Sequence, residues 1–376
     1  MRIFTFIFAL ALMFSFCKDA SAEQISVSAQ SAILIETSSD KIVYEKNAYA
    51  KLPMASTTKI MTALCAIENS YTNKIVEVDK RAVGTEGSSI YLAYGEKISV
   101  RDLLYGLLLH SGNDAAEALA YAVSGSREKF VDLMNKTAKK IGAENTHFTN
   151  PSGLYDDEHY TTSHDLALIA SYAMKNELFA KIVSTKSAKI SNGDKGYDRV
   201  LSNHNKLLRL YPGCIGVKTG YTKKCGRCLV SCARRDGVTL ICVTLNDPDD
   251  WNDHMKLFDF GFSVCNVYRV ASSGDYAMKL GVSGGSKKYC TAEFADSLED
   301  TCVNSDMGKI SIKYDLPGNL KAPVRSGQKI GRASLLSDGK QIDSADLICR
   351  DSAAAPEKAS FKETLGENIK KYLFSE

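Results

Sequence analysis

Apolar residues recur at every third or fourth position in five stretches of the chain, which is the period of an α-helix with one buried face. These stretches cover residues 57–69, 100–110, 113–123, 128–141 and 163–174. Ser111 and Gly112 separate the second stretch from the third, so two helices meet at a turn there. Ser56 directly precedes the first stretch, and we therefore expect it at the N-terminus of a helix.

Runs rich in β-branched and other apolar residues lie on both sides of these helices. Residues 31–44 form two such runs around a polar tetrad, which predicts a hairpin. The segments 216–221, 227–233 and 238–246, joined by short polar turns, predict three more strands. Helices bracketed by strands predict one layered α/β domain that extends from residue 23 to about residue 267.

Short alternating runs between Gly, Ser and Asp turns occupy residues 268–351 and predict a small all-β domain of the sandwich type, with strands at 310–314 and 330–336. Residues 352–356 have the composition of a linker. Beyond them, up to residue 376, an apolar stripe at helical spacing predicts an amphipathic helix. This helix would either pack on the β-domain or lie in a membrane surface with its lysines facing anionic headgroups.

The first 22 residues have the three parts of an export signal. Arg2 supplies the positive start, residues 3–16 form an apolar run, and residues 20–22 fit a small-residue cleavage site. The mature chain would begin near Glu23. A retained membrane helix is the alternative, but the run is short for a bilayer span. A lipid anchor on Cys17 is disfavoured because small residues do not precede it.

With 376 residues, 44% of them hydrophobic and 24% charged, the chain is long enough for two folded domains. Lys and Arg number 47 against 44 Asp and Glu, so the formal charge of +3 gives no field that would attract nucleic acid. The 6 histidines have no metal-ligand spacing, and we interpret them as structural or surface residues. We expect no metal or other cofactor.

Loss of Cys17 with the signal would leave ten of the 11 cysteines, an even number that permits disulfides in an exported protein. Cys225, Cys228 and Cys232 are neighbours in the sequence, but their uneven spacing makes a poor zinc set. Because Cys228 and Cys232 fall on one face of a predicted strand, buried thiols are favoured over a disulfide, and a metal site is the least favoured.

Ser56-Thr57-Thr58-Lys59 places a hydroxyl and an amine one helical turn apart on the same face. A serine becomes a good nucleophile when a base takes its proton, and a lysine can do so where burial and nearby cations keep it neutral. The helix start also offers a backbone N–H to an oxyanion. Alone, the pattern is not specific: Ser56 could be a helix cap. The same spacing follows Ser15, Ser38, Ser126, Ser326 and Ser337.

Two further motifs follow Ser56 in the chain. Ser111-Gly112-Asn113 puts a hydroxyl and an amide in the turn between two helices, and Lys218-Thr219-Gly220 ends with a glycine that lets a substrate backbone approach a strand edge. Each alone is compatible with an ordinary turn or strand end. Together, S-x-x-K, S-x-N and K-T-G in this order are the set of penicillin-binding proteins and class A β-lactamases.

On these motifs the chain resembles the low-molecular-mass penicillin-binding proteins of the serine D-alanyl-D-alanine carboxypeptidase type, over nearly the whole mature sequence. Further matching segments are 53–64, 150–154, 205–208, 211–213, 322–324 and 327–328. The resemblance implies an α/β (α+β) transpeptidase domain of the serine β-lactamase and penicillin-binding-protein type. Its antiparallel sheet would be flanked by helices and followed by a small all-β domain and an amphipathic anchor helix in 352–376.

The resemblance also implies a role for each motif residue. Ser56 would attack the carbonyl between the two terminal D-alanines of a peptidoglycan stem peptide, and Lys59 would accept its proton. Ser111 would pass a proton to the leaving amine, and Asn113 would hold the substrate and Lys59. Thr219 and Gly220 would bind the substrate beside Lys218, which pairs with the terminal carboxylate. The N–H groups of Ser56 and Tyr221 would hold the oxyanion.

Three rival functions use the same residues. A class A β-lactamase would need a glutamate for its deacylating water, and no E-x-x-L-N segment lies between Asn113 and Lys218. An endopeptidase that cuts cross-linked stems, and a penicillin-binding sensor with little turnover, stay open. For the favoured carboxypeptidase we expect β-lactams to acylate Ser56, and the protein to be exported and peripheral on the outer face of the cell membrane.

Overall fold

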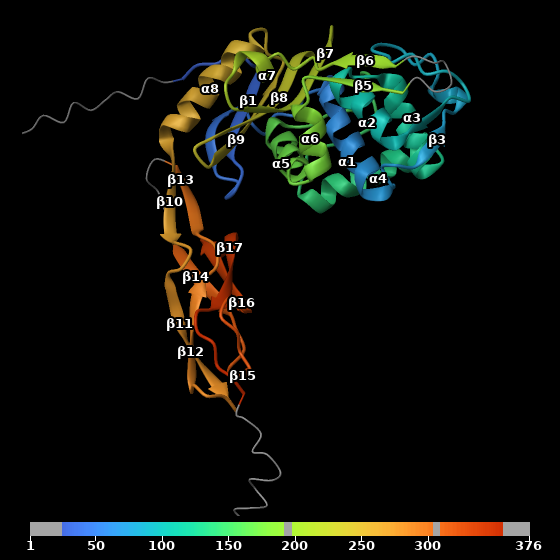
Figure 1. Cartoon of the computed structure of the whole chain (residues 1–376). Helices are drawn as coiled ribbons and strands as arrows, with labels where there is room; N and C mark the ends of the chain where they lie inside the picture. The colour runs from blue at the N-terminus through green and yellow to red at the C-terminus, as the bar shows by residue number, and fades with distance from the viewer. Residues whose placement is uncertain (1–24, 192–197, 304–308, 356–376) are drawn as a thin grey trace, which may run out of the picture.

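The structure is a computed structural model that describes residues 25–191, 198–303 and 309–355. Two domains follow one another along the chain, an α/β domain and an all-β domain (Figure 1). This architecture is the one that the sequence predicts. The expected export signal and the expected C-terminal amphipathic helix lie outside the described residues.

A five-stranded antiparallel sheet forms the centre of the first domain. Its strands, in spatial order, are β2 (Ile42–Lys46), β1 (Ser31–Glu36), β9 (Val238–Leu245), β8 (Gly226–Arg235) and β7 (Cys214–Thr222). The N-terminal hairpin therefore pairs with strands from the end of the domain, as β1 lies beside β9. Because β7 is the edge strand, one side of it is open to the helical part of the domain.

Helices cover both faces of this sheet (Figure 1). The larger group comprises α1 (Lys59–Asn69), α2 (Val100–Leu109), α3 (Asn113–Ser124), α4 (Arg127–Ile141), α5 (Ser163–Met174) and α6 (Glu177–Ser184). The opposite face carries α7 (Leu207–Leu210) and α8 (Asp250–Val264). Alternate residues of β1 face the two layers: Ile33 joins the core under α1, and Leu34 joins the core under α8.

The five predicted helices are present, and α6, α7 and α8 are additional to them. Short elements that the sequence analysis did not predict are the 3₁₀ turns η1 (Ala55–Thr58) and η2 (Lys80–Ala82), and the hairpins of β3 (Ile75–Glu77) with β4 (Lys97–Ser99) and of β5 (Ser187–Ile190) with β6 (Arg199–Ser202). Strands of three or four residues carry too little alternation to be recognised.

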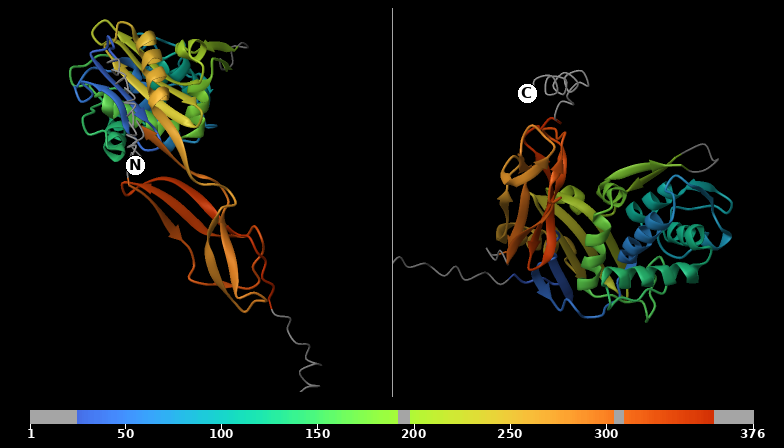
Figure 2. Two further views of the ribbon diagram at one scale, coloured as in Figure 1. Left: turned by 90° about the vertical axis from the view of Figure 1, so that its left-hand side faces the viewer. Right: turned by 90° about the horizontal axis from the view of Figure 1, so that it is seen from below.

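The second domain begins where α8 runs directly into β10 (Cys265–Ala271), which pairs with β13 (Leu298–Val303). Its main sheet contains β14 (Ile310–Asp315), β16 (Lys329–Ser337), β17 (Lys340–Cys349), β12 (Tyr289–Phe294), β11 (Tyr276–Ser283) and β15 (Leu320–Lys321), in that order. Figure 2 shows this domain extending away from the first sheet. Lys340 nevertheless reaches back to Asp40 in the β1–β2 turn, with 2.5 Å between ammonium and carboxylate.

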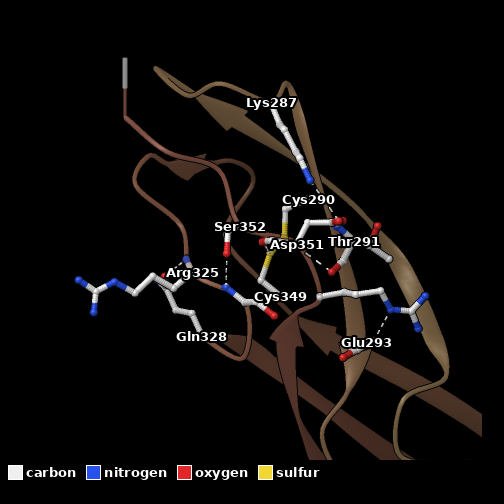
Figure 3. The surroundings of a disulfide bond; sticks show 11 residues. Lys287, Cys290, Thr291, Glu293, Arg325, Gln328, Cys349, Asp351 and Ser352 are labelled. Carbon is white, nitrogen blue, oxygen red and sulfur yellow. Dashed lines mark hydrogen bonds and ion pairs between the residues drawn. A yellow bond between two sulfur atoms is a disulfide. The ribbon is translucent and has the colours of Figure 1, made fainter. Parts of the chain in front are cut away.

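A disulfide joins Cys290 of β12 to Cys349 of β17 in the core of the second domain (Figure 3). The two cysteines are 59 residues apart in the sequence. In the chain-entropy account, a crosslink across a loop of this length stabilises a fold by ~4 kcal/mol. This bridge supports a domain whose core is small. By contrast, Cys225, Cys228 and Cys232 are buried free thiols, as the sequence pattern indicates.

Replacing both bridging cysteines, Cys290→Ser with Cys349→Ser, should lower the free energy of unfolding of the second domain by about 2–4 kcal/mol. The single tryptophan, Trp251, lies in the first domain, so its fluorescence follows that domain alone during urea unfolding. We expect circular dichroism to show an earlier transition for the second domain while the fluorescence midpoint stays unchanged. A fluorescence midpoint that moves equally would contradict this separation of the two domains.

Candidate active site

Ser56 lies in the 3₁₀ turn η1, which leads directly into α1 at Lys59. Side chains hold this turn: the Thr57 hydroxyl donates to the Met54 carbonyl at 2.6 Å, and the Thr58 hydroxyl donates to the Ala55 carbonyl at 2.7 Å. The helix α1 begins directly after this turn. Ser56, which we expected at the start of a helix, therefore lies in the short 3₁₀ segment that precedes it.

The amine of Lys59 is the centre of the site. Its side chain is fully buried, and Nζ lies 2.9 Å from the Ser56 hydroxyl, 2.6 Å from the Asn113 side-chain oxygen and 2.5 Å from the Ser152 carbonyl. These three partners come from η1, from α3 and from the loop before α5. An ammonium donates all three of its hydrogens in this arrangement.

The surroundings of Lys59 hold its pKa well below the ordinary value, first through burial and second through repulsion from Lys218. Asp114 and Glu117, which lie one turn apart on α3, act in the opposite direction. Burial also lowers the pKa of Lys218 to about 7. A lysine with a depressed pKa can give up a proton near neutral pH, and its free lone pair can then accept one from the adjacent serine.

The S-x-N motif forms the turn between α2 and α3, as the helical periodicity predicts. Asn113 is nearly buried and donates through Nδ2 to the Glu86 carbonyl at 2.5 Å, which fixes the oxygen that faces Lys59. Ser111 has a positive φ of 64° and is 5% exposed. Among the hydrogen bonds of the described residues none involves the Ser111 hydroxyl. Ser111 is therefore placed near Lys59 by the turn that it shares with Asn113.

The K-T-G motif lies in the edge strand β7, beside the turn η1 that carries Ser56. A Cβ placed on Gly220 would be 3.0 Å from the backbone nitrogen of Ser56, a tight contact, so glycine lets the strand approach this turn closely. Lys218 is 1% exposed and donates to the Thr219 carbonyl at 2.7 Å. Tyr221 follows at the surface with 66% of its area exposed.

A cavity of about 270 Å³ opens beside Ser56. Residues of the predicted motifs that line it are Ser56, Thr219, Gly220 and Tyr221. The other motif residues do not line it and are buried: Lys59, Asn113, Lys218 and Ser111. The structure therefore brings the hydroxyl of Ser56 and the K-T-G strand to one solvent-accessible surface, with the lysine amine beneath them.

The sequence analysis missed several residues of the same cavity wall. His204 contributes to it, and burial followed by the charge of Lys218 lowers the pKa of this histidine to about 4. Arg227 of β8 forms an ion pair with Asp250 at 2.7 Å, and Trp251 lies beside them. Single polar residues with no local pattern carry no signal in one sequence, so only their position in space reveals them.

Comparisons with known proteins show the family of the chain. The family profile described as D-alanyl-D-alanine carboxypeptidase matches residues 18–249, and that of the penicillin-binding protein 5 C-terminal domain matches residues 267–354. The chain belongs to the D-alanyl-D-alanine carboxypeptidase family. It is a serine-type D-alanyl-D-alanine carboxypeptidase, a hydrolase of the penicillin-binding-protein group, and the endopeptidase and sensor alternatives are not favoured.

Individual relatives agree with this assignment over most of their length. The D-alanyl-D-alanine carboxypeptidase DacF of Bacillus subtilis is 33% identical over 95% of this chain and 96% of its own. DacC of Escherichia coli is 30% identical over 93% and 89%. Penicillin-binding protein 5 of Haemophilus influenzae superposes with a TM-score of 0.63 at 28% identity, and covers 88% of this chain and 98% of its own.

His159 contacts the turn η1 of this carboxypeptidase through Thr58. Its Nδ1 accepts from the Thr149 N–H at 3.0 Å, so the proton is on Nε2, which lies 2.7 Å from the Thr58 hydroxyl. Burial, the largest cause, lowers the pKa of His159 to about 4. Neutral His159 therefore stabilises the fold above its ordinary pKa of ~6.5, and this contribution is lost as the pH falls toward 4.

Between pH 7 and pH 5 the wild type should lose about 2 kcal/mol of unfolding free energy through His159. His159→Gln should lose correspondingly less over the same interval, because glutamine does not titrate. Urea unfolding at both pH values measures the difference, with His147→Gln on the neighbouring β-bridge as the matched control. If the pH dependence of the unfolding free energy is the same in His159→Gln as in the wild type, His159 does not contribute to it.

Proposed function

We propose that Ser56 is the acyl-ester nucleophile and Lys59 its proton acceptor in the removal of the terminal D-alanine from peptidoglycan stem pentapeptides. The observation that carries this proposal is the 2.9 Å contact between the Ser56 hydroxyl and a fully buried lysine amine. The depressed pKa of Lys59 supports it, because a neutral amine can take the serine proton.

In the first step the Ser56 oxygen bonds to the carbonyl carbon between the two D-alanines while its proton moves to Lys59. The N–H groups of Ser56 and Tyr221 hold the oxyanion that forms. The close approach of Gly220 to the Ser56 nitrogen supports this role, because it brings the strand that carries Tyr221 next to the nucleophile turn. Fixed backbone donors of this kind contribute much of the rate in acyl transfer.

The bond to the leaving D-alanine then breaks, and its amine gains a proton that passes from Lys59 through Ser111. Asn113 keeps the Lys59 amine and the substrate amide in register, which its 2.6 Å contact to that amine supports. A water molecule hydrolyses the acyl-enzyme and regenerates Ser56. β-Lactams acylate the same oxygen, since their strained amide resembles the D-Ala-D-Ala bond.

Lys218 and Thr219 bind the terminal carboxylate of the substrate, with Gly220 leaving room for its backbone. Lys218 has a pKa of about 7 in the free protein, where burial opposes its charge. A bound carboxylate would favour the protonated form, since an opposite charge raises the pKa of an ammonium group. Binding of the substrate therefore favours the uptake of a proton by Lys218.

The mature protein, from residue 23, acts on the outer face of the cell membrane and is held there by the amphipathic segment within 352–376. Within the described parts of the chain every helix is too short or too polar to span a bilayer. The sequence of this segment supports an in-plane anchor, because it combines an apolar stripe at helical spacing with several lysines.

The 23–356 fragment should release D-alanine from diacyl-L-Lys-D-Ala-D-Ala, and Ser56→Ala should abolish this release. Lys59→Met should reduce it by about 10²–10⁴-fold, the usual contribution of a general base. A D-alanine assay measures all three proteins, with fluorescent penicillin labelling as the test of a folded site in the wild type. Release that survives in Ser56→Ala would disprove the nucleophile.

Truncation after Pro356 should move the protein from the membrane pellet to the supernatant, because the apolar stripe is then absent. Sedimentation with vesicles measures this for the mature chain and the truncated chain side by side. The D-alanine assay is the control, and its rate per molecule should be the same for both. A truncated chain that still pellets with vesicles would show that the segment packs elsewhere.

A further inference from the structure

Arg227 of β8 gives the wall of the active-site cavity a permanent positive charge. Among the described residues that line this cavity it is the one lysine or arginine. His204 is neutral at pH 7, because burial lowers its pKa to about 4. Lys218 is buried and does not line the cavity. A negatively charged group of a ligand in this cavity therefore meets Arg227 as the cation of the wall.

The register of the sheet places Arg227 on the same face as Thr219. Arg227 lies directly opposite Tyr221 in the β7–β8 pair, and Thr219 is two residues before Tyr221 on β7. Side chains two residues apart on a strand share a face, so Thr219 and Arg227 are diagonal neighbours across the two strands. Such neighbours are within reach of a long side chain. Thr219 and Arg227 therefore form one side of the cavity that Ser56 also lines.

Asp250 holds the guanidinium of Arg227 in this position. The buried carboxylate of Asp250 accepts from Nη2 of Arg227 at 2.7 Å and from the N–H of Trp251 at 2.9 Å. Asp250 is the first residue of α8, where the unpaired N–H groups of the helix favour a negative charge. Its charge is therefore shared between the helix start and Arg227. A guanidinium has five N–H donors, so Arg227 keeps others for a ligand.

One donor of Arg227 has no partner in the described part of the chain. Its Nε is buried there without a hydrogen bond. A buried donor without a partner costs free energy, and most such groups in folded proteins are paired. An arginine that served only to tie β8 to α8 would be expected to have this donor satisfied. The unpaired Nε, together with a side chain that is 41% exposed, indicates a group that receives a ligand.

We propose that Arg227 is a specificity-determining residue that binds the terminal carboxylate of the stem peptide together with Thr219. This inference rests on the proposed function, since it places the D-Ala-D-Ala bond beside Ser56. The fork of a guanidinium matches a carboxylate, and charge-assisted hydrogen bonds are stronger than neutral ones. A peptide that is amidated or extended at its end lacks a carboxylate at this position. Arg227 thereby favours the release of one terminal residue over cleavage within a longer chain.

Arg227→Gln in the mature chain should lower kcat/KM for diacyl-L-Lys-D-Ala-D-Ala about 10–100-fold, the size expected when a hydrogen bond to a charged group is lost. For the C-terminal amide of the same tripeptide, kcat/KM should stay within about threefold of the wild-type value, because the amide has no charge to lose. Mass spectrometry of the common product, diacyl-L-Lys-D-Ala, measures both reactions. The matched control Arg234→Gln removes an exposed arginine from the same strand and should cleave both substrates like the wild type.

Arg227→Lys keeps a charge without the fork and should recover part of the rate for the acid alone. If Arg227→Gln fails to fold because Asp250 is left unpaired, Arg227→Gln/Asp250→Asn removes both charges and should show the same selective loss. The fluorescence of Trp251 during urea unfolding reports the folded first domain. Equal losses for the acid and the amide would assign Arg227 a structural role and overturn the inference, as would an unchanged rate for the acid.

Binding to the Ser56→Ala protein separates this inference from the proposed nucleophile. In that background Arg227→Gln should weaken binding of the acid tripeptide about tenfold and leave binding of the amide unchanged, as NMR titration can measure. This comparison does not depend on whether Ser56 forms an acyl-enzyme. Turnover by Ser56→Ala would count against the nucleophile and not against Arg227. Equal affinities for the acid tripeptide with and without Arg227 would count against Arg227 and not against the nucleophile.

Discussion

The rest of the first domain depends on one buried amine. Lys59 has no exposed surface, and its nitrogen is satisfied only where η1, α3 and the loop that carries Ser152 meet. A buried ammonium is costly unless its hydrogens are donated to well-placed acceptors. The packing of α1 against α3 and α5 can therefore be understood as the scaffold that brings these three acceptors to one point.

Two lysines in one site require compensation. The charge of Lys218 disfavours the charged form of Lys59, while Asp114 and Glu117 of α3 favour it. Asp114 also accepts from the N–H groups of Ile90 and Leu92, which ties α3 to the segment above the site. Asp114 therefore raises the pKa of Lys59 and also fixes the backbone of the neighbouring segment. A change at Asp114 would affect both at once.

Sequence reasoning reached the parts of the fold and site that have a local pattern. The periodicity of the five long helices and the order of three short motifs were sufficient to bring Ser56, Lys59 and Asn113 into one hypothesis. The Ser152 acceptor is a backbone carbonyl, which any residue could supply, and His204, Arg227 and Asp250 are isolated polar residues. Two helices had a usable signal that was missed: Phe179, Ile182 and Val183 follow a helical spacing in α6, and Leu257, Phe258 and Gly261 do so in α8.

The cysteines of β8 lie beside the K-T-G strand as buried thiols. Cys228 lies directly across from Gly220 in the sheet, fully buried, and burial raises the pKa of its thiol to about 12. Cys232 has the same property. At neutral pH such thiols are protonated, and a thiol is a weak nucleophile compared with its thiolate. The strand next to the K-T-G motif therefore carries protonated thiols, which do not compete with the proposed chemistry of Ser56.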